Sequence, residues 1–331
     1  MTFTSDGRVV IERPLEDGDD RTLADDVLDG LTHHFKDLPP KHLYDTVGAE
    51  LFDLICEQPE YYPTRTERAI LEQNAAAMIE LTGATEIVEL GSGTAAKTRL
   101  LLEAMADAGH LDLYVPVDVT ESMVRASASA IATEFPSLNV HGIVGDFERH
   151  LDHIPKPRGP RIVMVLGGTI GNLTQGKRRR FLRSLSKLLG DDGFLLIGTD
   201  LVKEPAVIEA AYNDAAGVTA AFNLNVLTVI NRELNADFDV AAFEHVSFFD
   251  RQREWIEMRL RALRPMRVRI ADLDLTVSFA AGEEMRTEIS TKFTPARLES
   301  DLAAAGLEPA ARYTDPEELY ALTLARARTA R

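Results

Sequence analysis

The sequence is poor in cysteine, in basic residues and in long apolar runs. One cysteine among 331 residues excludes an internal disulfide framework and favours a reducing compartment. The 36 lysines and arginines are outnumbered by 53 aspartates and glutamates, and the net charge of −17 makes nucleic acid an unexpected partner. No secretory signal opens the sequence, and no apolar stretch is long enough to span a membrane. We expect a cytoplasmic protein without a membrane partner.

Alternating strand and helix patterns fill the middle of the sequence. A hydrophobic content of 45% is enough for a large core. Five apolar runs have the pattern of strands: 86–90, 113–118, 140–145, 161–167 and 194–200. Amphipathic helix patterns separate these runs, so we predict a parallel, doubly wound α/β sheet. Upstream, the spacing of Thr64 and Glu67 predicts a capping box that opens a helix running to Leu81.

The pattern changes after Asp200. Helix patterns and then the alternating strands of an antiparallel meander occupy residues 201–283. The chain then continues as strand, helix and strand, at 284–293, 298–307 and 319–327. The expected division is a cofactor-binding domain at 63–200 and 284–331, a substrate-binding domain at 20–62 and 201–283, and a flexible lead at 1–19.

A glycine turn follows the first of the five strands, in the stretch EIVELGSGTAAKT. Gly91, Gly93 and Ala96 have the spacing of a dinucleotide-binding loop, and loops that bind S-adenosylmethionine have the same spacing. Asp118 ends the second strand, where a carboxylate accepts hydrogen bonds from ribose hydroxyls with either cofactor. The motif alone leaves a nicotinamide or a flavin open.

Three further features favour S-adenosylmethionine. Glu89 gives the glycine turn an acidic entry. Asp146 and Phe147 end the third strand, where an acid suits the adenine amino group and a ring suits the adenine face. The last strand, helix and strand supply the sixth and seventh strands of a methyltransferase sheet, the last of them antiparallel. We therefore predict an α/β fold with a Rossmann-like, seven-stranded class I methyltransferase sheet and an inserted α+β substrate-binding domain.

Several motifs stand in the order found in one family, from about Leu38 onward: PPKHLYD, ELFDLICEQPEYYPTR, VELGSGTAAKT, GGTIGNL, DAAGVTAAFN and GEEMRTEISTKF. In these motifs the sequence resembles the histidine-specific methyltransferases of actinobacterial ergothioneine biosynthesis. The resemblance implies trimethylation of the α-amine of L-histidine to hercynine, with S-adenosylmethionine as methyl donor and S-adenosylhomocysteine as second product. Gly168 departs from the family pattern, in which a serine can occur, and Ala95-Ala96 replaces a more polar pair.

The resemblance also implies which residues bind the two ligands. The implied cofactor site consists of Gly91, Lys97, Asp118, Asp146 and Phe147. The implied histidine site consists of Tyr61, Asn172, Tyr212, Glu288, Ile289 and Ser290. The further positions that match the lining of the same pocket are Tyr44, Phe52, Gly167, Thr169 and Met258. Asn172 and Tyr61 are the expected catalytic residues.

The side chains suit the implied chemistry. Methyl transfer from a sulfonium needs a neutral amine held in line, so positioning is the protein's main task. Asn172 follows the fourth strand and offers a donor and an acceptor to the amine and carboxylate of an amino acid. Glu288 and Ser290 are two apart on a strand, so they share a face and can bind an imidazole. Without the resemblance, Glu-x-Ser is more typical of a solvated strand face, and the loop at 167–172 also fits a tight helix N-terminus.

The residues alone leave other functions open. The same scaffold could methylate another small amine or amino acid, and the glycine turn also permits a nicotinamide oxidoreductase. A cofactor-binding adaptor is a non-enzymatic alternative. His150 and His153 lack a thiol or carboxylate cluster with metal spacing, so we expect no metal. No sustained heptad pattern is present, and we expect a monomer.

Overall fold

The computed structural model describes residues 2–3, 7–14, 22–147 and 149–328, which fall into two compact units. Unit 1 contains the described residues of Met1–Asp19, Arg65–Leu201 and Phe293–Arg331. Unit 2 contains those of Asp20–Thr64 and Val202–Lys292. No helix in the described ranges is long and apolar enough to cross a membrane.

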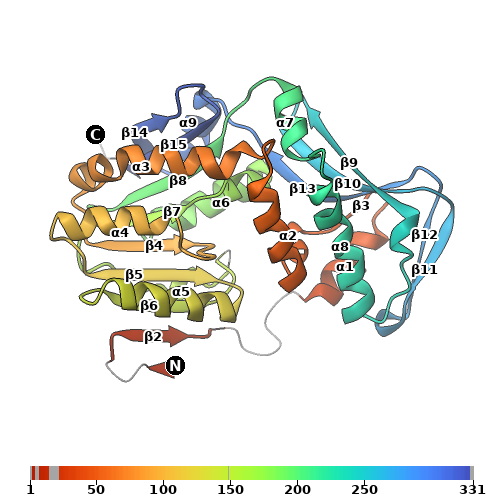
Figure 1. The fold of residues 1–331 in the computed structure, drawn as a ribbon, viewed down its shortest axis with the longest axis horizontal. Coiled ribbons are helices and arrows are strands. Elements are labelled where there is room, and N and C mark those ends of the chain that lie inside the picture. Colours follow the sequence, from red (N-terminus) through yellow and green to blue (C-terminus); the bar gives the residue numbers. More distant parts are fainter. Residues whose placement is uncertain (1, 4–6, 15–21, 148, 329–331) are drawn as a thin grey trace. The chain divides into compact units, whose positions relative to one another are not determined.

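Unit 1 is built on a largely parallel sheet (Figure 1). Its described strands run in the order β1-β2-β6-β5-β4-β7-β8-β15-β14. They are β1 (Thr2–Phe3), β2 (Val9–Glu12), β4 (Glu86–Leu90), β5 (Leu113–Asp118), β6 (Asn139–Val144), β7 (Arg161–Val165), β8 (Phe194–Asp200), β14 (Leu307–Thr314) and β15 (Tyr320–Ala327). The strands from β6 to β8 are parallel, and β15 is antiparallel to β8. The predicted α/β class and its five central strands are confirmed.

Helices cover both faces of this sheet. They are α3 (Tyr62–Thr82), α4 (Thr98–Asp107), α5 (Glu121–Glu134), α6 (Gln175–Ser186) and α9 (Pro295–Ala304). Successive residues of β4 point to opposite faces: Ile87 packs in one core with α3, α4 and α5, and Val88 packs in another with α6 and α9. Both side chains are fully buried. All of β4 is buried, and burial on both faces explains why Ile87 and Val88 are consecutive apolar residues and do not alternate with exposed polar ones.

The strand predicted at 284–293 does not belong to this sheet. β13 (Glu284–Thr291) lies in unit 2, where it pairs with β10 (Trp255–Ala262). The sixth strand of the methyltransferase sheet is instead β14, which pairs with β15 at the sheet edge. The sequence LEPAARYT hides this strand, because it contains a proline and Leu307 is its one buried residue. The predicted domain boundary at residue 284 is therefore wrong, and unit 1 resumes at Phe293.

Part of the lead predicted to be flexible at 1–19 is a strand. β2 pairs in parallel with β6, and Val9 and Ile11 are buried. At the end of β2, the Glu12 carboxylate lies 3.3 Å from His141 Nε2 and 3.1 Å from His153 Nδ1. The prediction gave too much weight to the acidic stretch that follows; residues 15–21 lie outside the described residues.

The predicted capping box at Thr64 is also wrong. α3 begins at Tyr62, so Thr64 and Glu67 lie inside the helix. Thr64 Oγ1 is 3.3 Å from Cys56 Sγ, and the fully buried Glu67 carboxylate bonds to other elements. A spacing of three residues also places two side chains on one face of a helix, so the pattern does not distinguish a cap from a helix interior.

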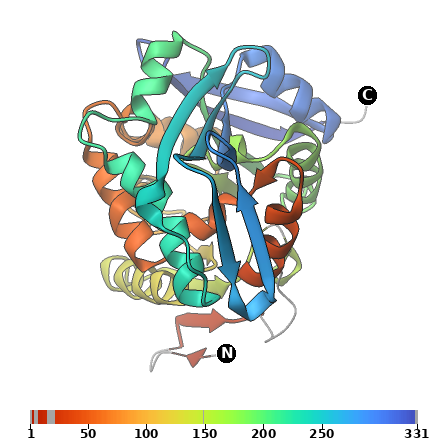
Figure 2. The same cartoon turned by 90° about the vertical axis from the view of Figure 1, so that its right-hand side faces the viewer.

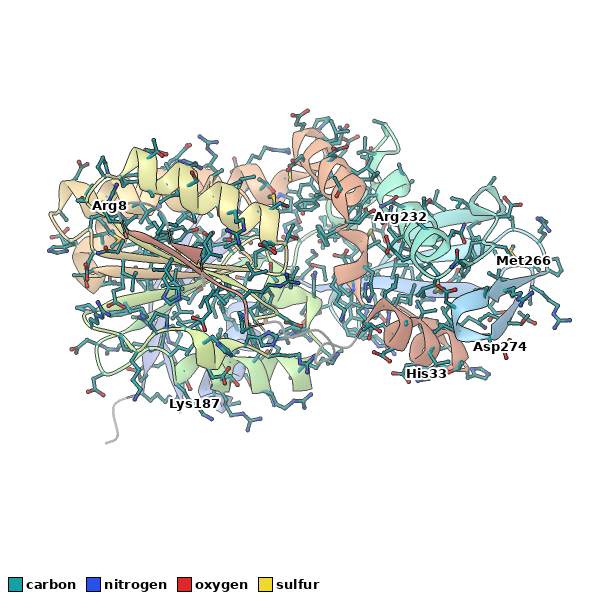
Figure 3. All side chains as sticks on the ribbon, turned by 90° about the horizontal axis from the view of Figure 1, so that it is seen from below. Arg8, His33, Lys187, Arg232, Met266 and Asp274 are labelled. Atoms are coloured by element: carbon teal, nitrogen blue, oxygen red, sulfur yellow. The ribbon has the colours of Figure 1, made fainter. Side chains whose placement is uncertain are left out.

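Unit 2 combines helices with a second sheet (Figure 2). Its helices and turns are α1 (Leu23–Thr32), η1 (Pro40–Leu43), α2 (Thr46–Glu57), α7 (Pro205–Ala211), α8 (Val218–Glu233), η4 (Val240–Ala242) and η5 (Ala271–Leu273). Its other strands are β3 (Lys36–Asp37), β9 (Phe243–Asp250), β11 (Met266–Ile270) and β12 (Leu275–Phe279). In the described part of the unit the sheet order is β3-β13-β10-β9, and β11 and β12 form a separate hairpin. In Figure 3, Met266 marks the start of β11 and Asp274 the turn before β12.

An ion pair joins the amino ends of β4 and β7. Glu86 and Arg161 are register partners with fully buried side chains. Arg161 Nε donates to Glu86 Oε2 at 2.8 Å, and Arg161 Nη1 donates to the Pro155 carbonyl at 2.8 Å. Arg158 N donates to Glu86 Oε1 at 2.8 Å. Because this pair lies at the amino ends, the carboxyl ends of both strands remain for the loops that bind ligands in such sheets.

Candidate active site

The turn after β4 brings bare backbone to the carboxyl edge of the sheet. Gly91 and Gly93 have φ of +78° and +48°, in the region that favours glycine. Gly91 N donates to the Val117 carbonyl at 2.8 Å, and Gly93 N donates to Asp118 Oδ2 at 3.1 Å. The glycine turn is therefore bonded to the end of β5.

The ends of β5 and β6 bring the other predicted nucleotide-binding residues toward this turn. Asp118 Oδ1 accepts from Thr120 N at 3.0 Å, so each Asp118 oxygen holds one backbone donor and has acceptor capacity for another. A Cβ built on Gly91 would lie 3.7 Å from the Phe147 ring, which shows that Phe147 borders the turn. Asp146 precedes Phe147, and both are half-buried.

The loop after β7 carries three predicted residues, Gly167, Thr169 and Asn172. Gly167 and Gly168 both have φ of +70°, which explains glycine at both positions. A 3₁₀ turn, η3 (Thr169–Asn172), follows them, and Thr169 Oγ1 donates to the Leu166 carbonyl at 2.9 Å. The Thr169 hydroxyl thus stabilises its own loop, while Asn172 ends the turn in a half-buried position.

Lys97 lies between the glycine turn and α4, and its ammonium forms an ion pair with Glu67 of α3. Glu67 Oε1 also accepts from Gly167 N at 2.9 Å. One buried carboxylate therefore bonds to both the predicted cofactor lysine and the start of the loop that carries Asn172. The sequence reading missed this role, because Glu67 resembles a helix cap.

In unit 2, four predicted aromatic residues contact one another in series. Ring centroids are 5.4 Å apart for Tyr44 and Phe52, 6.1 Å for Phe52 and Tyr61, and 6.4 Å for Tyr61 and Tyr212. Phe222 of α8 was not predicted as a site residue, and its ring centroid lies 5.2 Å from that of Tyr44. Burial, with a smaller effect of Tyr212, raises the pKa of Tyr61 well above its ordinary value. Tyr61 therefore stays a neutral phenol that can donate a hydrogen bond.

A β-bulge in β13 determines which face Glu288 occupies. Met258 pairs with Glu288, whereas the next residue, Arg259, pairs with Arg286, so Thr287 is the extra residue. The bulge shifts the alternation of side chains by one from Glu288 onward. The sequence pattern gave no sign of this shift.

Beyond the bulge, Glu288 and Ser290 share a buried face, with exposed fractions of 8% and 5%. Met258, opposite Glu288, is buried on the same face. Ile289 pairs with Glu257, so its side chain points to the other face and only its backbone lies between the two polar residues. Burial raises the pKa of Glu288 to about 7, although the charge of nearby Lys292 opposes the shift.

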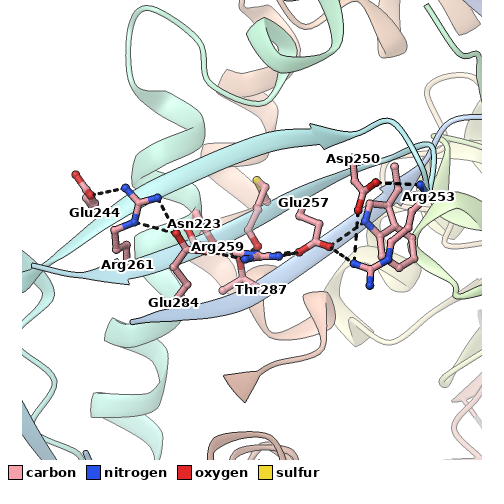
Figure 4. A network of polar contacts seen from close by, with 11 residues as sticks. Asn223, Glu244, Asp250, Arg253, Glu257, Arg259, Arg261, Glu284 and Thr287 are labelled. Atoms are coloured by element: carbon pink, nitrogen blue, oxygen red, sulfur yellow. Dashed lines mark hydrogen bonds and ion pairs between the residues drawn. The ribbon is translucent and has the colours of Figure 1, made fainter. Parts of the chain in front are cut away.

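The other face of β10 carries a row of ion pairs (Figure 4). Glu257 Oε2 accepts from Arg259 Nε at 2.8 Å, and Arg259 Nη1 donates to Glu284 Oε2 at 2.7 Å. Arg261 Nη2 donates to Glu284 Oε1 at 2.6 Å, and Trp255 Nε1 donates to Glu257 Oε1 at 2.9 Å. These charges pair with one another, so this face stabilises the sheet.

Lys292 is a residue of the Glu288 face that the sequence reading missed. Its side chain is fully buried, and its Nζ donates to Tyr212 Oη at 3.0 Å and to Ser290 Oγ at 3.1 Å. An ammonium only donates, so the Ser290 oxygen accepts and its own hydrogen can be given to another acceptor. The position two residues after Ser290 is the signal that could have revealed Lys292.

Asn223 and His245 hold the bulge and Tyr212 together, and they were also missed. Asn223 Oδ1 accepts from Thr287 Oγ1 at 2.5 Å, and Asn223 Nδ2 lies 2.9 Å from His245 Nδ1. His245 Nε2 lies 2.9 Å from the Tyr212 carbonyl, which only accepts, so Nε2 carries the hydrogen and Nδ1 accepts. Burial lowers the pKa of His245, which keeps this ring neutral.

Comparison with known proteins identifies the family of this chain. The model of a family described as histidine-specific, S-adenosylmethionine-dependent methyltransferases matches residues 23–327. The chain is 52% identical over 303 residues to the histidine N-alpha-methyltransferase of Mycolicibacterium smegmatis, covering 92% of this chain and 94% of that one. It is 50% identical over 310 residues to the protein of the same name from Mycobacterium tuberculosis, covering 94% and 96%. The chain belongs to the histidine-specific methyltransferases.

A more distant relative is the ergothioneine biosynthesis protein 1 of Neurospora crassa, which is 32% identical over 200 residues, or 59% of this chain and 23% of that one. The resemblance found in the sequence is thus confirmed, and so is the methyltransferase class. The residues of unit 1 fit the cofactor of this methyltransferase family. Two left-handed glycines leave space at the turn, Asp118 offers acceptors to hydroxyls, and the Phe147 ring offers an apolar surface.

The raised pKa of Glu288 predicts a pH effect on the stability of this methyltransferase. A folded-state pKa of about 7, above the ordinary value of 4.5, favours folding at low pH, and this contribution is lost as pH rises through 7. Glu288→Gln removes the titration, so the variant should gain about 3 kcal/mol of unfolding free energy relative to wild type between roughly pH 4.5 and 8. Urea unfolding at several pH values measures this difference.

A second buried carboxylate, Glu89, titrates in the same pH range, because burial also raises its pKa to about 7. Glu89 titrates in both proteins, so its effect cancels in the comparison. Parallel stability curves for wild type and Glu288→Gln would contradict the pKa assigned to Glu288.

Proposed function

We propose that this methyltransferase transfers three methyl groups from S-adenosylmethionine to the α-amino nitrogen of L-histidine and gives hercynine, a step in ergothioneine biosynthesis. The observation that supports the proposal most is its identity of 52% and 50% to two histidine N-alpha-methyltransferases, over more than nine-tenths of each chain. The buried carboxylate and hydroxyl on one face of β13 support an imidazole as the side chain that is recognised.

Unit 1 holds the methyl donor in this proposal. S-adenosylmethionine supplies a methyl group on a sulfonium, an electrophile that a neutral amine attacks. Asp118 accepts from the ribose hydroxyls, Asp146 accepts from the adenine amino group, and Phe147 lies against the adenine. Gly91 allows close approach of the backbone, and Lys97 donates to the methionine carboxylate.

The amino acid is bound through its ends. Asn172 binds the amine and the carboxylate with its amide oxygen and nitrogen. Glu288 accepts the imidazole N–H, and Ser290, whose oxygen accepts from Lys292, donates its hydrogen to the other ring nitrogen, which is an acceptor in a neutral imidazole. Tyr61 donates a hydrogen bond to the bound amino acid but does not act as a base, since burial raises its pKa. Water takes the proton of the ammonium before methyl transfer.

Aromatic walls suit a nitrogen that becomes a cation with growing apolar bulk. Tyr44, Phe52, Tyr61 and Tyr212 contact one another in series, and their rings present apolar edges and electron-rich faces. Such faces stabilise quaternary ammonium groups. We propose that Phe222, packed against Tyr44, extends the same wall.

Mass spectrometry of reactions with the purified protein tests the function. Each amino acid is incubated with S-adenosylmethionine, and trimethylated product is expected with histidine alone. Products from another amine or amino acid would favour the alternative, a methyltransferase of a different small substrate. An NADH-induced thermal shift without one from S-adenosylhomocysteine would instead favour an oxidoreductase, and cofactor binding without any product would favour an adaptor.

The Glu288 face predicts how the substrate preference can be changed. In Glu288→Ala combined with Met258→Val, two buried cross-strand partners become smaller, and the imidazole loses an acceptor. The ratio of kcat/KM for histidine to that for a larger aromatic amino acid should fall about tenfold or more. Competition kinetics measure this ratio, with the two single variants as controls. An unchanged preference would contradict the assignment of this face to the imidazole.

We also propose a monomeric enzyme in the cytoplasm, with no metal and no nucleic acid partner. The single cysteine suits a reducing compartment, and the net charge of −17 disfavours nucleic acid.

A further inference from the structure

Glu67 is a fully buried carboxylate that collects donors from three separate elements of unit 1. Its Oε1 accepts from Gly167 N and from Tyr320 Oη, each at 2.9 Å. Its Oε2 lies 3.0 Å from Gly167 N and forms the ion pair with Lys97. A buried carboxylate is costly unless it is paired and hydrogen-bonded, and here both conditions are met.

The sheet leaves room for this carboxylate. A Cβ built on Gly198 of β8 would lie 2.1 Å from Glu67 Oε1 and 2.7 Å from Tyr320 Oη. Any other residue at position 198 would therefore displace the carboxylate or the phenol. Glycine at this position in the middle of a buried strand is explained by Glu67, not by its backbone conformation.

Two of the three donors of Glu67, Lys97 and Gly167, belong to the two segments that the proposed function assigns to the two ligands. Lys97 is 22% exposed, so its ammonium can pair with Glu67 and still donate to a ligand. Gly167 begins the loop that ends at Asn172. We propose that Glu67 is a positioning residue that fixes Lys97 and the Asn172 loop relative to each other, before and during catalysis. This inference rests on the proposed roles of Lys97 and Asn172.

Glu67→Gln tests the inference, because it keeps the shape of the side chain and removes its charge. The amide has one oxygen for three donors, and its nitrogen opposes another donor. The affinity for S-adenosylhomocysteine, measured by calorimetry, should fall about tenfold or more, and KM for histidine should rise. Tyr320→Phe leaves the contacts to Lys97 and Gly167 in place and should have a smaller effect. Glu80→Gln, at an exposed position of the same helix, should change neither quantity.

A double-mutant cycle distinguishes positioning from general stability. If Glu67 acts on the cofactor through Lys97, then Glu67→Gln combined with Lys97→Met should bind S-adenosylhomocysteine no more weakly than Lys97→Met alone. Additive losses would overturn the inference, and so would an unchanged or tighter affinity in Glu67→Gln. If Glu67→Gln does not fold, Glu67→Asp, which retracts the carboxylate from its three donors, goes through the same cycle and is judged by the same criteria.

The outcome for Glu67 is separable from the proposed function. Coupling between Glu67 and Lys97 in ligand binding, together with a wild-type protein that does not trimethylate histidine, would overturn the function and keep the inference. A wild-type protein that makes hercynine, together with normal ligand affinity in Glu67→Gln, would overturn the inference and keep the function.

Discussion

Asn172→Ala should lower kcat/KM for histidine about 100-fold or more and leave the affinity for S-adenosylhomocysteine nearly unchanged. In the proposed role, the Asn172 amide makes hydrogen bonds to a charged amine and a carboxylate. Hydrogen bonds to charged groups contribute about 1.5–3 kcal/mol each, and 1.4 kcal/mol corresponds to a factor of ten. Steady-state kinetics and calorimetry measure the two quantities.

The control for this experiment is Asn139→Ala, at the exposed amino end of β6, away from the carboxyl edge of the sheet. It should leave kcat/KM close to the wild-type value. If Asn172→Ala kept more than roughly a tenth of wild-type kcat/KM, the loss would be smaller than one charged hydrogen bond. The loop after β7 would then not bind the reacting end of the amino acid.

Arg161→Met should destabilise the protein by about 3–5 kcal/mol, because it leaves the Glu86 carboxylate buried without its partner. The pair lies at the amino ends of β4 and β7, whereas the predicted site residues follow their carboxyl ends. At temperatures where the variant is folded, kcat should therefore stay near that of wild type. Urea unfolding and an activity assay at low temperature measure both effects.

Two variants control for the ion pair. Glu86→Gln combined with Arg161→Met removes the unpaired charge and should recover part of the lost stability. Arg68→Met breaks an exposed pair with Glu72 and should cost less than about 1 kcal/mol. An Arg161→Met effect as small as that of Arg68→Met would show that the buried pair is not a major source of stability.

Local sequence patterns predicted the fold correctly for the strands and helices whose own residues show their burial. In β4, β5 and β7 apolar residues occupy consecutive positions because both faces are buried, so these strands were visible in the sequence. β14 was not visible, because an edge strand with one buried residue has no such run. β13 was found as a strand but placed in the wrong sheet, since strand pairing depends on distant residues.

The same limit applies to the site. Gly91 directly follows β4, Asp118 ends β5 and Asn172 lies in the loop after β7, so their position at the carboxyl edge follows from the order of elements. Glu67 could not be found this way, because its role depends on residues that arrive from other parts of the chain. The spacing from Ser290 could have revealed Lys292, but its contact with Tyr212 depends on a distant part of the chain. The family motif places Ile289 in the site, but it does not say to which face of the strand the side chain points. That face follows from the alternation along β13.

β2 occupies the outer side of β6, with Val9 to Glu12 in register with Val140 to Ile143. Without it, a row of amide and carbonyl groups on β6 would face water and offer a template to another chain. By covering this edge, β2 protects β6 from edge-to-edge pairing with another chain. Shortened versions that begin beyond Glu12 would expose the edge of β6, even though they retain every residue assigned to a ligand.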